Sequence, residues 1–231
     1  MIPKTIHYCW FGRKPIPEIV RMYMMTWKIF LSDYEIKEWN EDNFDINVCD
    51  FVREAYENHK YAFVADYVRL HALYNEGGIY LDTDVEIIRN MDNLLNNECF
   101  LGLETKERVG TSVIGSVSGC PFISDLLEYY RQHHFIKSDG GFDMKPNTLI
   151  MSEYLKKNSS YNVVIYPIDC FSPICYETKK GSPTDKTYSI HHYESSWFPL
   201  YRRIETRFWN RLGLRDLQLL FRLMNKLCLV K

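Results

Sequence analysis

The sequence lacks long apolar segments, paired cysteine motifs, internal repeats and low-complexity tracts. No uninterrupted apolar run approaches the roughly 20 residues that cross a bilayer, and the start of the chain lacks the apolar stretch of a secretion signal. The seven cysteines form no C-x-x-C pair, and their odd number argues against a closed disulfide framework. We therefore expect a soluble, cytoplasmic protein with reduced, mostly buried thiols.

Length and composition favour one folded core. A chain of 231 residues is long enough for one α/β domain and too short for two full-sized ones. The aromatic fraction of 15% is high, and such rings either fill the core or line a cleft for a sugar or base. The net charge of −2 conceals an asymmetry, because residues 201–231 carry 8 Lys and Arg against 2 Asp and Glu. No nucleic-acid partner is expected.

Hydrophobic patterning predicts alternating strands and helices. Strands are expected at 4–11, 34–39, 79–81, 85–88, 99–103, 112–117, 162–166 and 187–192, and helices at 18–30, 47–58, 61–76, 121–134 and after Pro146. This alternation indicates an α/β fold with a twisted, mainly parallel sheet flanked by helices. Ligands of such sheets bind at the carboxyl ends of the strands.

Two aspartates follow a short apolar strand. Gly77 and Gly78 end the preceding helix, the strand at 79–81 follows, and Asp82 therefore lies at its carboxyl end. Asp82 and Asp84 together offer oxygen ligands for a hard cation such as Mg²⁺ or Mn²⁺, with a diphosphate completing the coordination. A D-x-D pair alone also arises by chance in solvated turns, so the surrounding sequence must decide whether this pair is a metal site.

The context is a long motif that resembles glycosyltransferase family 32. Residues 63–70 read FVADYVRL and residues 73–84 read LYNEGGIYLDTD, which gives D-x-x-R followed by G-G-x-Y-x-D-x-D. The opening residues 2–12, IPKTIHYCWFG, and the late residues 190–197, IHHYESSW, are also similar to that family. The resemblance covers about residues 2–198. It implies a GT-A-like, Rossmann-type domain over residues 1–200.

The resemblance also implies roles for particular residues. Asp66, Arg69, Asp82 and Asp84 match the catalytic group, in which the Asp and Arg three positions apart hold hydroxyls of the donor. From the residues alone, Asp66 and Arg69 could equally form a surface ion pair along one helix face. The further donor contacts implied are Trp10, Phe63, Ala65, Tyr80, Thr83, Ser196 and Trp197. Trp10 matches the ring that stacks on the nucleotide base, with a core position as the alternative.

The metal site needs a third ligand, and the resemblance implies a late histidine. His191 and His192 are adjacent, and only one of two neighbouring strand residues faces the metal. The sequence does not decide between them, and we favour His192. The expected cofactor is Mn²⁺ or Mg²⁺.

A second loop offers a weaker signal. Gly140-Gly141 and Pro146-Asn147-Thr148 precede a helix, so backbone N–H groups and Thr148 could meet an acceptor or an anion there. A plain N-cap explains Asn147-Thr148 equally well.

The implied reaction is transfer of a hexose, with retention of anomeric configuration, from a nucleoside-diphosphate sugar to a hydroxyl. UDP-galactose or UDP-glucose is the first expectation for the donor and GDP-mannose the next. The expected acceptor is a lipid-linked bacterial surface glycan such as capsule, exopolysaccharide or lipopolysaccharide. The alternatives are a nucleotide-sugar hydrolase, a toxin-like transferase acting on protein, and a non-catalytic module that binds nucleotide sugar or membrane.

The C-terminal residues 201–231 form a basic tail. Its apolar residues follow helical spacing, namely Leu217, Leu220, Phe221, Met224, Leu227 and Cys228. A basic amphipathic helix adsorbs to anionic membranes, which would place the protein at the inner face of the cell membrane. Packing on its own domain, or on a second copy in an oligomer, would produce the same periodicity.

Overall fold

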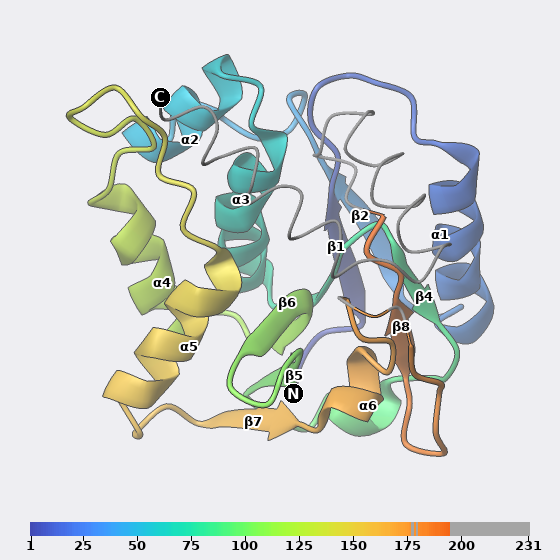
Figure 1. Cartoon of the computed structure of the whole chain (residues 1–231). Helices are drawn as coiled ribbons and strands as arrows, with labels where there is room; N and C mark the ends of the chain where they lie inside the picture. The colour runs from blue at the N-terminus through green and yellow to red at the C-terminus, as the bar shows by residue number, and fades with distance from the viewer. Residues whose placement is uncertain (177, 179, 195–231) are drawn as a thin grey trace.

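The computed structural model describes residues 1–176, 178 and 180–194, in which helices cover both faces of a central sheet (Figure 1). The elements in chain order are β1 (Thr5–Cys9), α1 (Glu18–Phe30), β2 (Glu35–Trp39), α2 (Asp50–Glu57), α3 (Tyr61–Glu76), β3 (Gly78–Leu81), β4 (Val85–Ile87), η1 (Asp92–Leu94), β5 (Cys99–Leu103), β6 (Val109–Ser116), α4 (Pro121–Arg131), α5 (Asn147–Lys157), β7 (Val163–Tyr166), α6 (Ile168–Phe171) and β8 (Ser189–His191). None of these helices is long and apolar enough to cross a membrane.

The strands form one large sheet and one small ladder. The six-stranded sheet has the order β2-β1-β3-β6-β5-β7. Only β6 runs against its neighbours, since β1 pairs in parallel with β2 and β3, and β5 pairs in parallel with β7. The prediction of a mainly parallel α/β sheet is confirmed. Strands β4 and β8 pair with each other in a separate antiparallel ladder.

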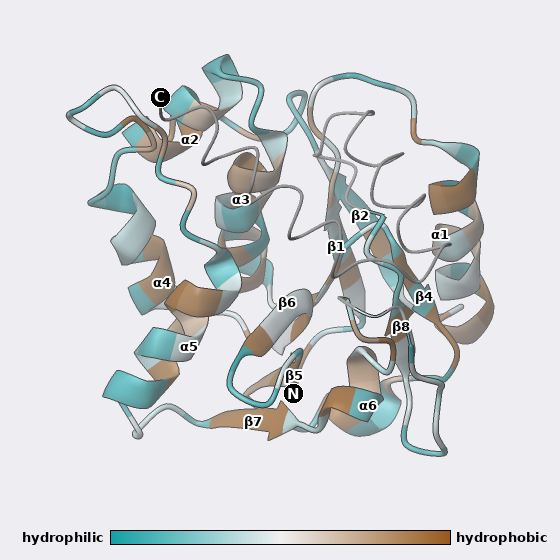
Figure 2. Cartoon of the chain, in the orientation of Figure 1, coloured by the Kyte–Doolittle hydropathy of each residue, from teal (hydrophilic) through white to brown (hydrophobic). Residues whose placement is uncertain are grey.

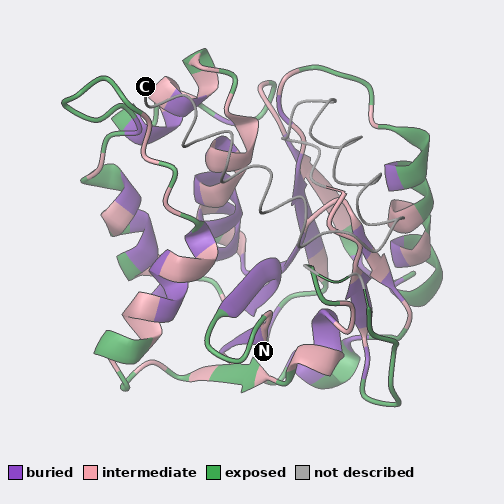
Figure 3. Cartoon of the chain, viewed as in Figure 1, coloured by how far each residue is buried: buried purple, intermediate pink, exposed green. Residues whose placement is uncertain are grey.

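Alternate residues of the central strands supply two hydrophobic cores. On β3, Ile79 and Leu81 face the core that contains Trp27 of α1, whereas Tyr80 faces the opposite core beneath α2, α3, α4 and α5. Every residue of β6 is buried, and this strand is purple in Figure 3. Gly115 on β6 faces the ring of Phe100, and a Cβ there would lie 1.9 Å from Cε1 of that ring. The sheet is therefore covered on both faces.

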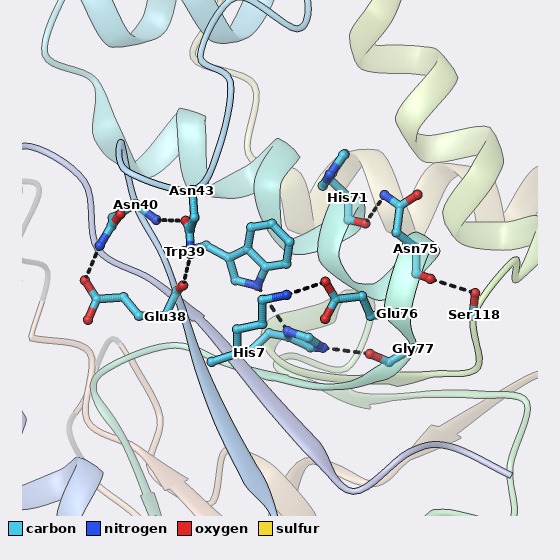
Figure 4. Close-up of polar contacts among 11 residues, drawn as sticks. His7, Glu38, Trp39, Asn40, Asn43, His71, Asn75, Glu76, Gly77 and Ser118 are labelled. Atoms are coloured by element: carbon cyan, nitrogen blue, oxygen red, sulfur yellow. Dashed lines mark hydrogen bonds and ion pairs between the residues drawn. The ribbon is translucent and has the colours of Figure 1, made fainter.

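The start of β3 is fixed by buried polar contacts that Figure 4 shows in close-up. Gly77 has φ of +67°, and a Cβ at this position would lie 2.8 Å from the backbone nitrogen of Ser118. Nε2 of His7 donates to the Gly77 carbonyl at 2.8 Å, while Nδ1 accepts the indole N–H of Trp39 at 3.0 Å. This pattern requires a neutral imidazole, and burial lowers the pKa of His7 accordingly. These two hydrogen bonds of His7 fix the point at which β3 begins, and they therefore fix the position of Asp82 at its other end.

Several sequence predictions fall outside this picture. Ser196, Trp197 and the tail at 201–231 lie outside the described residues, so the domain boundary at residue 200 stays a prediction. The short helices η1 and α6 were not predicted. Cys9, Cys99, Cys120 and Cys170 are buried thiols that form no disulfide.

Candidate functional site

The turn after β3 positions the two aspartates. Asp82 follows the fully buried strand, and its backbone N–H donates to the carbonyl of Ser112 on β6 at 2.9 Å. Its own carbonyl accepts the N–H of Val85 at 3.0 Å, which closes a tight turn through Thr83 and Asp84. Asp82 and Asp84 therefore lie at the carboxyl end of β3, where the sequence predicted them.

The small ladder brings a histidine to these carboxylates. His191 pairs with Val85 across β4 and β8, and its Nε2 lies 3.3 Å from Oδ1 of Asp84. The other oxygen of Asp84 accepts the backbone N–H of Glu194 at 2.8 Å. One ligand atom from each of Asp82, Asp84 and His191 lies within 4.8 Å of the others. The three side chains form a cluster with the composition of a metal site.

The electrostatics and the donor chemistry of this cluster suit a divalent cation. Burial alone would raise the pKa of Asp84, but the charge and hydrogen bond of His191, with the N–H of Glu194, lower it to about 2. Burial by itself would lower the pKa of His191. The negative charge of Asp84 and its hydrogen bond outweigh this effect, so the pKa of His191 is raised. Nδ1 of His191 is buried and has no hydrogen-bond partner among the described residues. The two carboxylates are oxygen ligands that suit Mn²⁺ and Mg²⁺, and the imidazole is a ligand typical of transition metals.

His192 lies on the other side of the ladder. Its Nε2 contacts the carboxylate of Glu86 at 2.8 Å, and its ring stacks on Tyr23 of α1 with 4.1 Å between centroids. Its backbone N–H donates to the carbonyl of Asp84 at 3.0 Å. The pairing register places His191, the alternative that the sequence left open, beside the aspartates, and which histidine binds a metal stays a prediction.

Arg69 on α3 joins two of the predicted acids beneath the site. One terminal nitrogen lies 3.0 Å from Asp66 and 3.5 Å from Asp82. Nε donates to the carbonyl of Ala65 at 3.1 Å, and the other terminal nitrogen donates to that of Thr111 at 2.8 Å. The Arg69 side chain is 6% exposed and that of Asp66 is 15% exposed, so this is a buried pair rather than a surface one. Arg69 holds the carboxylates in place.

Tyr80 completes this buried group. Its hydroxyl donates to Oδ1 of Asp82 at 2.8 Å, and the Arg69 guanidinium lies over its ring, 4.6 Å from the centroid. Burial raises the pKa of Asp66 to about 6, against the opposing charge of Arg69. The same oxygen, Oδ1 of Asp82, thus lies close to both the Tyr80 hydroxyl and the Arg69 guanidinium, which leaves the carboxylate little freedom of orientation.

Asn147 joins the site from a distant part of the chain. Pro146 is the N-cap of α5, and no side chain caps the helix. Asn147 is instead buried, and its Nδ2 donates to the backbone carbonyl of Asp66 at 3.4 Å. Its Oδ1 has no partner among the described residues, so it can accept a hydrogen bond from a bound ligand. The N-cap alternative for Asn147 is not what the structure shows.

Sequence reasoning missed Glu104. This residue follows β5 and is partly buried near Asp82 and His191. Burial raises the pKa of Glu104, and the charge of His191 and a hydrogen bond with Tyr193 oppose that rise. The tyrosine ring in turn lies on the imidazole of His191, with 3.8 Å between centroids. No motif marks Glu104 in the sequence, because only the sheet order brings β5 beside β6 and the aspartate turn.

Two predicted donor contacts lie at the periphery of the site. Trp10 follows β1, and its indole N–H donates to the carbonyl of Lys14 at 2.6 Å. Phe63 packs on Phe135, with 5.1 Å between centroids. No contact within the described residues joins either ring to the aspartate cluster, so their roles toward a donor stay predictions.

Comparisons with known proteins agree with this geometry. Residues 17–101 match the family profile described as the glycosyltransferase sugar-binding region containing the DXD motif. The chain is 24% identical over 229 residues to an uncharacterized glycosyltransferase of Acanthamoeba polyphaga mimivirus, which covers 91% of this chain and 90% of that protein. It is 30% identical over 142 residues to inositol phosphoceramide mannosyltransferase 3 of Schizosaccharomyces pombe, which covers 58% of this chain and 40% of that protein.

A solved structure shows the same fold. A glycosyltransferase involved in the glycosylation of the major capsid of PBCV-1 matches with a TM-score of 0.53 at 11% identity, over 87% of this chain and 97% of that one. The chain thus spans nearly the whole mimivirus protein and about two fifths of the fungal enzyme. Residues 17–101 thus carry the DXD-containing sugar-binding region of glycosyltransferases, and the chain has a GT-A-like fold.

Proposed function

We propose that this glycosyltransferase moves a hexose from a nucleoside-diphosphate sugar to a hydroxyl of a lipid-linked surface glycan, with retention of configuration and with a divalent cation. The observation that carries the proposal is the convergence of Asp82, Asp84 and His191 at the end of β3, beside the buried pair of Asp66 and Arg69. This arrangement offers a cation site next to hydrogen-bonding groups for a sugar.

The described residues divide the work of binding a donor. A cation held by Asp82, Asp84 and His191 would neutralise the charge of the diphosphate, most of all as that group leaves. Asp66 and the free oxygen of Asn147 offer acceptors for sugar or ribose hydroxyls. Arg69 acts through the carboxylates of Asp66 and Asp82, since all the nitrogens of its guanidinium already have partners. The donor is thereby oriented by groups that are themselves fixed.

The transfer itself needs no base from the protein. The bond between the anomeric carbon and the diphosphate oxygen breaks, and a bond to the acceptor oxygen forms on the same face of the sugar. The proton of the acceptor hydroxyl passes to the leaving phosphate. Positioning and electrostatic stabilisation of the leaving group then supply the catalysis.

The named activities of relatives guide the choice of substrates. The fungal relative is named for mannosyl transfer to inositol phosphoceramide, a membrane lipid. A second one, at 30% identity over 147 residues, is a mannosyl phosphorylinositol ceramide synthase of Saccharomyces cerevisiae. These names support an acceptor carried by a lipid, and the mannosyl transfer that they name is a reason to test GDP-mannose as well as UDP-galactose and UDP-glucose.

The test is calorimetric binding of these three donors to the full chain, with Mn²⁺, with Mg²⁺ and with chelator. We expect one donor to bind only with a cation, and both Asp84→Ala and His191→Ala to lose that binding. His192→Ala is the matched control, because the imidazole of His192 faces Glu86. This variant should bind the donor as the native protein does.

Three outcomes would count against the proposal. Absence of binding by any donor would refute the nucleotide-sugar site. Cation-dependent binding without turnover in the presence of lipid and glycan acceptors would favour a non-catalytic module. Equal losses in His191→Ala and His192→Ala would show that the cation site is not the one described.

A further inference from the structure

Helix α1 is apolar on its outer side as well as its inner side. Five of the twelve exposed large apolar residues in the described chain lie on this helix. Ile19 is 40% exposed, Met22 58%, Met25 61% and Ile29 67%, and the spacing of these four residues puts them on one outward strip. Figure 2 colours several segments of α1 brown, and Figure 3 shows much of its outer side in green.

Packing of the domain does not require this outer strip. The inner side already buries Val20 and Trp27, and the Trp27 indole donates to the carbonyl of Val85 at 2.7 Å. The hydroxyl of Thr26 accepts the N–H of Ile87 at 2.8 Å. Single exposed apolar side chains are ordinary, but a contiguous row of large ones marks an interaction surface.

The charges beside the strip indicate what kind of surface it meets. Arg21 and Lys28 are exposed on α1, and Lys14 is exposed in the loop before it. None of these three cations makes an ion pair within the described residues. An apolar strip bordered by free cations is the pattern of a helix that lies in the interface of an anionic bilayer.

The position of α1 connects this surface to the site. Tyr23 stacks on His192, and its hydroxyl donates to Glu194 at 3.4 Å, where the described chain ends. The 37 residues that follow Glu194 carry 8 Lys and Arg against 2 Asp and Glu. That charge disfavours the tail as the partner of α1, which carries Arg21 and Lys28 against one acid, Glu18, and favours one anionic surface that attracts both.

We propose that α1 is a membrane-docking helix. Ile19, Met22, Met25 and Ile29 enter the acyl boundary of an anionic bilayer, and Arg21 and Lys28 contact its phosphate headgroups. The inference rests on the proposed lipid-linked acceptor, because docking through α1 would hold the aspartate turn close to lipid headgroups.

The test is co-sedimentation of the full chain with phosphatidylcholine vesicles, with and without phosphatidylglycerol. We expect binding to the vesicles that contain phosphatidylglycerol, and a partition roughly tenfold or more weaker for Met22→Ser/Met25→Ser, since two inserted side chains are lost. Val164→Ser/Ile165→Ser is the matched control. These residues are 38% and 42% exposed on the edge strand β7, and the change should leave the partition unchanged. Arg21→Glu/Lys28→Glu should weaken binding only to the anionic vesicles.

Other occupants of the strip give different results. Unchanged vesicle binding by Met22→Ser/Met25→Ser would overturn the proposal. If thermal stability of the full chain then fell, the tail would be the partner. If the mass measured by sedimentation fell instead, the partner of the strip would be a second copy of this chain. Donor binding by calorimetry is measured on the same variants and should be unaltered, so failure of the docking helix and failure of the nucleotide-sugar site are told apart.

Discussion

Arg69 provides the sharpest energetic prediction, because the chain contains two Asp–Arg pairs at the same helical spacing. Arg69 and Asp66 on α3 are buried, with side chains 6% and 15% exposed. Arg53 and Asp50 on α2 are 2.5 Å apart, with side chains 43% and 48% exposed. Both pairs are three positions apart on a helix, so a comparison isolates the effect of burial.

Replacing Arg69 with Met should lower the free energy of unfolding by about 3–5 kcal/mol, because two partly buried carboxylates lose their shared, buried cation. Arg53→Met should cost under about 1 kcal/mol, as exposed pairs do. The assay is urea denaturation of both variants in chelator. At pH 5 the loss in Arg69→Met should be smaller than at pH 8, since Asp66, whose pKa is already about 6, can then become neutral.

Equal losses in the two variants would refute the reasoning that burial makes the Arg69 pair different. A loss in Arg69→Met that did not change between pH 5 and pH 8 would refute the assignment of Asp66 as the uncompensated acid. Replacement of Tyr80 by Phe is a further check, because it removes one hydrogen bond to Asp82 and keeps the ring. It should cost about 1–3 kcal/mol.

Three more predictions concern single positions. Burial lowers the pKa of His7 in the folded protein below its ordinary 6.5, so the unfolded chain is protonated first as the pH falls. The free energy of unfolding should therefore decrease as the pH drops below about 6.5. In denaturation curves, His7→Gln should remove this dependence on pH. Asp66 has the opposite sign in metal-free protein, because its folded pKa is raised from 3.8 to about 6. Its contribution should grow by up to roughly 3 kcal/mol as pH falls from 6 toward 4, and Asp66→Asn should abolish that gain. Gly115→Ala should destabilise the fold by about 1–3 kcal/mol through its clash with Phe100, as a lowered thermal midpoint would show.

Local patterns were sufficient to predict most elements of the fold. The apolar spacing of residues 18–30 and 61–76 predicted α1 and α3 with the bounds that the structure has. Gly77 and Gly78 marked the end of α3, since their positive φ suits a residue without Cβ. The short helices η1 and α6 are too brief for a periodic signal to distinguish them from turns.

Pairing between distant segments was not predictable from local patterns. The choice between His191 and His192 depends on the register of β8 against β4, which no nearby residue specifies. Asn147 carries the ordinary signature of a helix start, and its contact with Asp66 arises from the docking of α5 near α3. Glu104 has no motif at all. The family motif predicted the aspartates, and the tertiary fold supplies their partners.

The ladder of β4 and β8 has a consequence for how the protein matures. Asp84 and the Glu194 N–H that steadies it are 110 positions apart in the chain. His191 can reach the aspartates only after nearly all the described residues have been synthesised. A nascent chain that stops before β8 would present two aspartates on a turn without their imidazole partner. Tight cation binding would therefore show that strand β8 has been made and has paired with β4.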